Sequence, residues 1–169
     1  MNILPFGVSS EYSELEMQNS LEIELTKKCF SSEYSSIKPI IIREHRIMEI
    51  GRISDLIVYV TDKKIFNIEC KLNNYIEVFE QAKDHLKWAD YSYICLPCSA
   101  YVPNYNLHKL IKHGIGLIYW FPESSLFSEV VQASYNKYKD KKLRKKIMPG
   151  IKSKLSKINS KKIIQKSLF

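Results

Sequence analysis

No apolar run in the 169 residues approaches the length of a membrane-spanning helix, so we do not expect an integral membrane protein. The first residues, MNILPFGVSSEYSE, lack a basic region followed by an apolar stretch, and we therefore expect no secretory signal. Four cysteines in a chain of this size do not resemble the disulfide framework of a small secreted protein. Together, these absences predict a cytoplasmic protein with reduced thiols.

The chain does contain enough apolar material for a folded core. Hydrophobic residues make up 45% of it, which excludes wholesale disorder, and its length suits one domain. The sequence has no internal repeat. We expect the domain to span residues 1–136 and to carry an appendage, residues 137–169, that is partly helical or disordered.

Charge is divided unevenly along the chain. The net charge is +8, but residues 137–169 hold 13 Lys and Arg against one acid, so this basic tail carries +12 and the rest carries −4. Such a run is either a solubilising end or an arm that contacts nucleic-acid phosphates, and we expect contact with DNA. Within the tail, Pro149-Gly150 should separate a helix from a weaker second segment. The candidate nucleic-acid-binding residues are Arg52, Lys141, Lys142, Arg144, Lys145 and Lys146.

Hydrophobic periodicity alternates between helical and strand patterns along residues 11–121. Helices are predicted over about 11–29, 75–89 and 106–113, and strands over 39–43, 55–60, 65–71, 91–96 and 116–121. This order predicts an α/β domain with a mixed central β-sheet flanked by helices.

The strands at 55–60 and 65–71 each separate apolar from polar side chains. Because side chains alternate between the two faces of a strand, one side of this hairpin is entirely apolar and is predicted to face the core. Its residues are Leu56, Val58, Val60, Phe66, Ile68 and Cys70. The opposite side carries Asp55, Glu69 and Lys71.

The connection between these strands decides whether Asp55 and Glu69 meet. A two-residue turn at Asp62-Lys63 would set Asp55 opposite Cys70 and turn Glu69 to the wrong face. A three-residue loop would pair Asp55 with Glu69, with Cβ atoms about 5 Å apart. We therefore predict an odd-length loop or a β-bulge in this hairpin.

Asp55, thirteen further residues and then Glu69-Cys70-Lys71 resemble the PD-(D/E)xK motif of restriction-endonuclease-like nucleases. Ser54 stands where that motif usually has proline. The order of elements is also similar over residues 11–121, and the basic tail lies outside the resemblance. The resemblance implies a restriction-endonuclease-like fold and metal-dependent hydrolysis of DNA phosphodiester bonds. Branched, junction, duplex and single-stranded DNA all stay open as substrates, and so does RNA.

The resemblance also implies a role for each motif residue. Asp55 and Glu69 would bind Mg²⁺ or Mn²⁺, together with the backbone carbonyl of Cys70, since these hard ions prefer oxygen ligands. Lys71 would hold or help deprotonate the attacking water and offset charge on the phosphate. Two facing carboxylates repel without a cation, so a metal explains them better than an ordinary pair of strand-end acids neutralised by a lysine.

Further site candidates lie outside the motif. Folds of this kind often supply a glutamate from the first helix, and Glu14 and Glu22 fall on or beside its apolar face. Gln81 follows in the next helix, where related families place a glutamine ahead of a tyrosine. Here His85 holds the tyrosine's position and is either a phosphate contact or a solvated helix histidine. Glu44 is a further candidate for supporting contacts.

Two other kinds of protein stay open. The first is a nucleic-acid-binding subunit that keeps the fold without catalysis. The second is a zinc-stabilised interaction module, because Cys95, Cys98, His108 and His113 have the residue types of a zinc site, although buried thiols explain the cysteines more simply. A nuclease with one site per chain would need a homodimer or a partner subunit to cut both strands.

Overall fold

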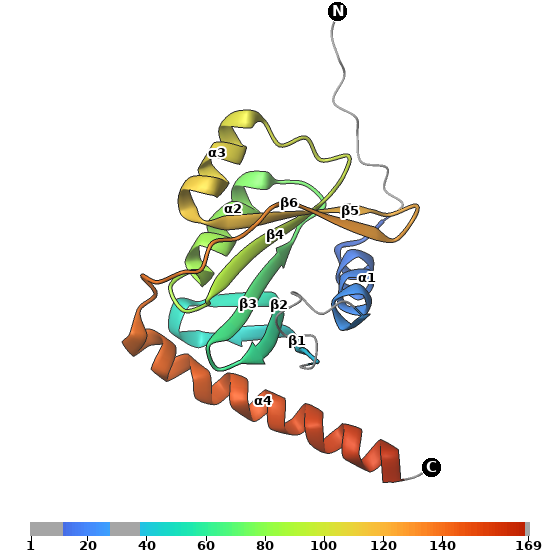
Figure 1. Cartoon of the computed structure of the whole chain (residues 1–169), viewed down its shortest axis with the longest axis vertical. Helices are drawn as coiled ribbons and strands as arrows, with labels where there is room; N and C mark the ends of the chain where they lie inside the picture. Colours follow the sequence, from blue (N-terminus) through green and yellow to red (C-terminus); the bar gives the residue numbers. More distant parts are fainter. Residues whose placement is uncertain (1–11, 28–37, 168–169) are drawn as a thin grey trace, which may run out of the picture.

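The computed structural model describes residues 12–27 and 38–167, with side chains described up to residue 160 (Figure 1). In chain order the elements are α1 (Glu14–Lys27), β1 (Ile40–Ile47), the short 3₁₀ turn η2 (Met48–Ile50), β2 (Arg52–Thr61), β3 (Lys64–Cys70), α2 (Tyr75–His85), β4 (Tyr91–Pro97), α3 (Asn104–His113), β5 (Ile115–Phe121), β6 (Leu126–Val131) and α4 (Lys141–Ser167). Each helix and strand predicted from the sequence is present, and β6 is an addition.

The six strands form one mixed sheet in the order β1-β2-β3-β4-β5-β6. The pairs β1·β2, β2·β3 and β5·β6 are antiparallel, whereas β3, β4 and β5 run parallel to one another. Parallel neighbours need a crossover, which α2 provides between β3 and β4 and α3 between β4 and β5. The predicted α/β fold, a mixed sheet flanked by helices, is therefore confirmed. None of the helices within 12–27 and 38–167 is long and apolar enough to cross a membrane.

Helices cover both faces of the sheet, and their buried residues divide the core into clusters. On one face, α1 buries Met17, Leu21 and Leu25 against the apolar side of the β2–β3 hairpin. On the other face, α2 and α3 pack over β4 and β5, and α4 packs over β1, β2 and β3. Figure 1 shows α4 running along the β1–β2 end of the molecule, away from α3. Both sides of the hairpin are therefore buried, including the side on which the sequence places Glu69.

A β-bulge in the β2–β3 hairpin sets its register. Thr61 pairs with Lys64 across a two-residue turn, but the next pair is Tyr59 with Ile65, which leaves Val60 between them without a partner in the ladder. The predicted bulge is confirmed. The ladder ends at Leu56 opposite Ile68. The same register extended by one residue would set Asp55 opposite Glu69.

The basic tail forms one helix rather than two segments. Pro149 lies inside α4, so the predicted division at Pro149-Gly150 is wrong. Ile147 and Ile151, on either side of the proline, are both buried against the sheet, as is Leu155. This packing on both sides offsets the hydrogen bond that a proline removes, so the helix continues.

Asp90 fastens the start of α4 to the sheet. Its carboxylate accepts the backbone N–H of Ile65 at 2.9 Å and pairs with Arg144 at 2.8 Å and with Lys139 at 2.9 Å. Asp90 is buried, so two cations and a backbone donor are what allow a charge to be placed there.

Replacing Ile151 by alanine should show that α4 is part of the folded core. Ile151 is fully buried, and an Ile→Ala change at such a position costs about 2–5 kcal/mol of unfolding free energy. The same change at the exposed Ile76 is the matched control and should cost less than about 0.5 kcal/mol. Urea unfolding followed by circular dichroism measures both. Equal, small losses would mean that α4 does not dock on the sheet.

Candidate functional site

The residues of the predicted motif lie at one edge of the sheet, where β3 ends. Lys71 follows the last residue of β3, and its backbone N–H donates to the carbonyl of Cys95 in the parallel neighbour β4 at 3.1 Å. Asp55 lies early in the antiparallel strand β2 and therefore at the same edge. The fold thus brings Asp55, Glu69, Cys70 and Lys71 together.

Asp55 is held by a backbone donor from the neighbouring strand. The N–H of Cys70 donates to its Oδ2 at 2.8 Å. Burial raises the pKa of Asp55, and the nearby charges of Glu14 and Glu44 raise it further, while the Cys70 N–H and Lys71 act in the opposite direction. The net shift is upward, so a proton or another cation at this carboxylate is favoured.

Glu69 is the most deeply buried carboxyl group of the motif, with 1% of its surface exposed. Burial raises its pKa to about 8, and the charge of Asp55 contributes in the same direction. Among the described residues, its Oε1 has no hydrogen-bond partner and lies 3.3 Å from His85 Nε2. A buried oxygen in this state is poorly compensated for its lost hydration, which favours a cation nearby.

Lys71 lies within reach of two further acids. Its Nζ is 3.4 Å from Glu14 Oε2 and 3.7 Å from Glu77 Oε1. Burial lowers the pKa of Lys71, but the charges of Glu14 and Glu77 outweigh burial, and the net pKa is raised. Lys71 is therefore a charged donor at neutral pH.

The structure distinguishes between the two glutamates predicted from the first helix. Glu14 joins the site through Lys71, whereas Glu22 pairs with Arg43 at 3.5 Å. Glu77, which the sequence analysis did not select, joins the site because α2 begins only four residues after Lys71. The acidic first turn of a helix directly after the motif was the signal that could have identified it.

Two residues of α2, Gln81 and His85, lie one helical turn apart, and each has a buried polar atom without a hydrogen bond among the described residues. These atoms are Gln81 Oε1 and His85 Nε2. His85 is completely buried, so the interpretation of a solvated helix histidine or a phosphate contact is wrong. The helix is amphipathic, and its core-facing side passes over the sheet at this residue.

Glu44 lies beside Asp55 in the sheet, at a break in the β1–β2 ladder. The pairs on either side are Arg43 with Leu56 and His45 with Ser54, and no pair joins Glu44 to Asp55. Glu44 also has a φ of 46°, in the left-handed region that few residues other than glycine adopt. This irregularity in β1 coincides with the position of Asp55, where such breaks often mark functional sites.

The predicted nucleic-acid-binding residues divide into two groups. Arg52 pairs with Asp84 at 2.8 Å, and Arg144 pairs with Asp90, so both guanidinium groups are engaged within the fold. The four lysines of the first turns of α4 are exposed instead. These are Lys141, Lys142, Lys145 and Lys146.

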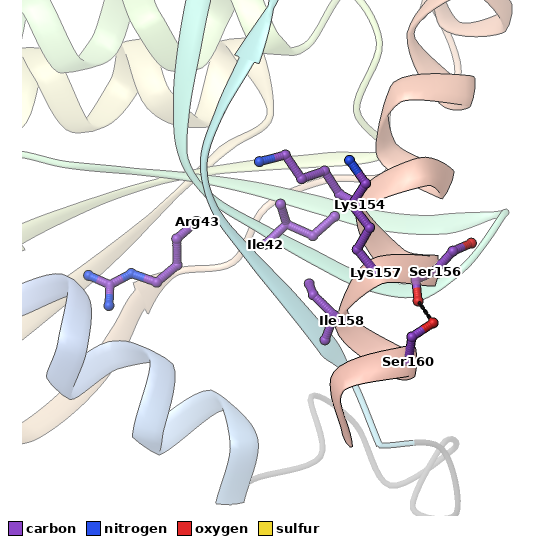
Figure 2. Close-up of a pocket in the computed structure, with 7 residues that line it drawn as sticks. All are labelled: Ile42, Arg43, Lys154, Ser156, Lys157, Ile158 and Ser160. Carbon is purple, nitrogen blue, oxygen red and sulfur yellow. Dashed lines mark hydrogen bonds between the residues drawn. The ribbon is translucent and has the colours of Figure 1, made fainter. Parts of the chain in front are cut away.

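A hollow lies between the second half of α4 and β1 (Figure 2), with a volume of about 530 Å³. Its lining consists of Ile42, Arg43, Lys154, Ser156, Lys157, Ile158 and Ser160. Figure 2 shows that the Arg43 side chain extends toward α1, so the lysines of α4 supply the cations on the helix side. The sequence analysis did not single out Lys154 or Lys157.

The cysteines and histidines of the predicted zinc alternative do not come together. Cys95 is buried opposite Cys70 in the β3–β4 ladder, while Cys98 is exposed and His113 packs edge-on against Phe79. Within 12–27 and 38–167, no group of three or more His, Cys, Asp or Glu side chains is arranged to hold a metal ion. A metal site built on only two carboxylates, such as Asp55 and Glu69, has too few side chains to count as such a group.

No protein-family model matches the sequence, and no curated protein matches it. A solved structure of a protein of unknown function from Silicibacter pomeroyi is similar at 17% identity, covers 70% of this chain and 75% of that one, and has a TM-score of 0.49. A repair endonuclease from Pyrococcus abyssi is similar at 21% identity, covers 63% of this chain and 46% of that one, and has a TM-score of 0.45. The chain thus spans less than half of the endonuclease, and neither likeness assigns it a function.

Glu69 and His85 should make the stability of the fold depend on pH in opposite directions. Between its ordinary pKa of 4.5 and the raised value of about 8, the folded protein keeps the proton of Glu69 that the unfolded chain has lost, so stability falls as pH rises. Burial lowers the pKa of His85 from 6.5 to about 4, which makes stability rise with pH over that lower interval. Above about pH 6.5, the effect of Glu69 therefore stands alone.

In chelator-treated protein, we expect the free energy of unfolding to fall by up to about 2 kcal/mol between pH 6.5 and 8. Glu69→Gln removes the ionisable group and should flatten the curve in this interval. Urea unfolding at half-unit pH steps measures both proteins. A Gln variant with the wild-type slope would show that another group titrates.

Proposed function

We propose that the chain is a metal-dependent nuclease that hydrolyses phosphodiester bonds of DNA. The observation that carries the proposal is the register of the bulged hairpin. It brings Asp55 and Glu69, two carboxyl groups whose pKa values are both raised, to one sheet edge beside the charged Lys71. This arrangement is the one expected from the residue spacing that resembles the PD-(D/E)xK motif.

The donor set fits Mg²⁺ or Mn²⁺. Both ions take oxygen ligands, and Mg²⁺ commonly uses one or two carboxylates and fills its remaining positions with water and substrate phosphate. Asp55 and Glu69 would hold the ion together with the carbonyl of Cys70. The Oε1 of Glu69, which has no hydrogen-bond partner within the part of the chain that the structure describes, supports this assignment. A bound ion would supply charge stabilisation and acidify a water molecule.

Lys71 would act as a charged hydrogen-bond donor. Its pKa is raised by Glu14 and Glu77, so a protonated ammonium that orients water and offsets charge on the phosphate suits it better than a general base does. Glu14 and Glu77 would hold the ammonium group at the site.

Contact with DNA would come from the lysines of α4. The buried stripe of α4 faces the sheet, which leaves Lys141, Lys142, Lys145, Lys146, Lys154 and Lys157 exposed. A cationic helix face of this kind binds phosphates through the release of counterions. Since one site cuts one strand, we propose a homodimer or a partner subunit wherever both strands are cut.

A nucleic-acid-binding subunit without catalysis is the second candidate. The complete burial of Glu69 and the bond from the Cys70 N–H to Asp55 favour it, because both suit acids that only support the sheet. Cleavage by the wild-type chain separates the two candidates.

Lys71→Ala and Asp55→Ala should each reduce cleavage by at least about 100-fold, since each removes a group that acts on the developing charge or on the ion. The assay uses duplex, branched and single-stranded DNA and RNA, with Mg²⁺, with Mn²⁺ and with chelator. Lys83→Ala is the control, because this lysine pairs with Glu80 on α2 and should leave cleavage unchanged. Cleavage by Lys71→Ala at the wild-type rate would reject the mechanism, and binding without any cleavage would favour the second candidate.

Neutralising lysines on α4 should weaken DNA binding and lower its salt dependence. Removing residues 137–169 would not isolate this effect, since α4 contributes buried core residues. The double variants Lys145→Ala/Lys146→Ala and Lys154→Ala/Lys157→Ala should each lower the slope of log K against log salt by about 0.9 per lost phosphate contact. Lys109→Ala/Lys112→Ala on α3 is the charge-matched control. Fluorescence anisotropy at several salt concentrations measures the slopes, and three equal slopes would contradict the assignment to α4.

A further inference from the structure

His85 lies between a donor and an acceptor at the end of α2. On one side, Trp88 Nε1 donates a hydrogen bond to His85 Nδ1 at 3.0 Å, and the two rings meet edge to face. On the other side, His85 Nε2 lies 3.3 Å from Glu69 Oε1. All three side chains are buried, with exposed fractions of 0%, 0% and 1% for Trp88, His85 and Glu69.

The Trp88 contact determines which nitrogen of His85 carries the proton. An indole N–H can only donate, so His85 Nδ1 must offer a lone pair. A neutral imidazole with a lone pair on Nδ1 carries its hydrogen on Nε2, the nitrogen that lies beside Glu69. This tautomer also prevents Nε2 from binding a metal ion, because the lone pair needed for coordination is absent.

His85 Nε2 and Glu69 Oε1 can form a hydrogen bond with each other. By geometric criteria, neither His85 Nε2 nor Glu69 Oε1 has a hydrogen-bond partner among the described residues, although both are buried. The backbone of Ile53 also lies close enough to the His85 ring to raise its pKa, so the ring N–H has two neighbouring acceptors, Ile53 and Glu69 Oε1. Buried polar groups are nearly always hydrogen-bonded, so a small adjustment that completes the contact between His85 Nε2 and Glu69 is favoured. The Nε2–H of His85 can donate to an unprotonated oxygen of Glu69 whether the carboxyl group is neutral or charged.

We infer that His85 is a positioning residue for the candidate metal site: Trp88 fixes its tautomer, and its Nε2–H holds the Glu69 carboxylate in the orientation that receives the ion. The consequence for metal binding rests on the proposed function. The tautomer and the contact do not. Outer hydrogen-bond partners of this kind typically change metal affinity or activity by 10–100-fold when they are removed.

Two substitutions at His85 separate its two contacts. His85→Gln places an amide nitrogen near the position of Nε2 and keeps a donor for Glu69. His85→Asn is shorter, and it keeps an acceptor for Trp88 but loses the donor for Glu69. We expect the affinity for Mn²⁺, measured by isothermal titration calorimetry on the full chain without DNA, to fall by about 10–100-fold in His85→Asn and to stay close to wild type in His85→Gln.

The tautomer is read directly by long-range ¹H–¹⁵N correlation spectra of the metal-free, ¹⁵N-labelled chain. We expect His85 Nδ1 to be unprotonated and Nε2 to carry hydrogen, and Trp88→Phe should release this preference and produce a mixture. An Nδ1–H tautomer in the wild-type protein would overturn the inference, as would equal Mn²⁺ affinity in His85→Asn and wild type. If His85→Asn does not fold, the same comparison is made between Trp88→Phe and wild type.

These readouts distinguish failure of the inference from failure of the proposed function. A wild-type chain that binds no Mn²⁺ and cuts no substrate would reject the metal-dependent nuclease, while the spectrum would still decide the contact between His85 and Glu69. A chain that cuts DNA and whose His85→Asn variant binds Mn²⁺ normally would keep the nuclease and reject the role of His85.

Discussion

One unpaired residue, Val60, sets the register on which the candidate site depends. The two-residue turn at the tip of the β2–β3 hairpin would by itself place Asp55 opposite Cys70, and the bulge at Val60 moves the pairing by one residue. With the bulge, Leu56 lies opposite Ile68, and both belong to the core cluster beneath α1. Without it, apolar and polar positions of the two strands would no longer coincide across the hairpin. The bulge therefore determines both which residues form the apolar cluster and which acids lie opposite each other.

The same hairpin also connects the site to the basic helix. Asp90 accepts the N–H of Ile65 in β3 and pairs with Arg144 in α4, so the start of the helix is fixed at the end of β3 opposite to Glu69. Residues of α4 further along then pack over β1 and β2. The orientation of the lysine-bearing face is thus set by buried contacts within the fold. A segment that is cationic in sequence is thus a helix docked on the sheet in the fold.

The sequence predicted the elements well where the apolar pattern had a clear period, and it predicted the bulge from one requirement, that Asp55 and Glu69 share a face. It did not predict β6, whose six residues are mostly exposed and show no alternation. It also placed a break at Pro149, because local propensity contains no information on the sheet that Ile147 and Ile151 contact. The complete burial of His85 is likewise a tertiary property, since it depends on how α2 lies over the start of β2. In general, hydrophobic patterns with periods of 2 and 3.6 residues were sufficient to predict the helices and strands. They could not predict contacts between residues that are distant in sequence.

The balance of charge at the sheet edge bears on the choice between a nuclease and a binding subunit. Glu14, Glu44, Asp55, Glu69 and Glu77 act electrostatically on one another or on Lys71, and Lys71 is the cation that these contacts share. Such an excess of acids repels a phosphate backbone, and a protein that only binds DNA through α4 gains nothing from it. A divalent ion between Asp55 and Glu69 would offset the charge of these two acids and would give a phosphate group a cation to bind. Burial is the largest cause of the raised pKa of both acids. The charges of Glu14 and Glu44 raise the pKa of Asp55 further, and the charge of Asp55 raises that of Glu69, so a nearby cation would favour both charged forms. An acidic edge and a cationic helix on one small domain can both contact one nucleic acid if a metal ion bound at the edge contacts its phosphates. The need for such an ion favours the proposed nuclease over a binding subunit.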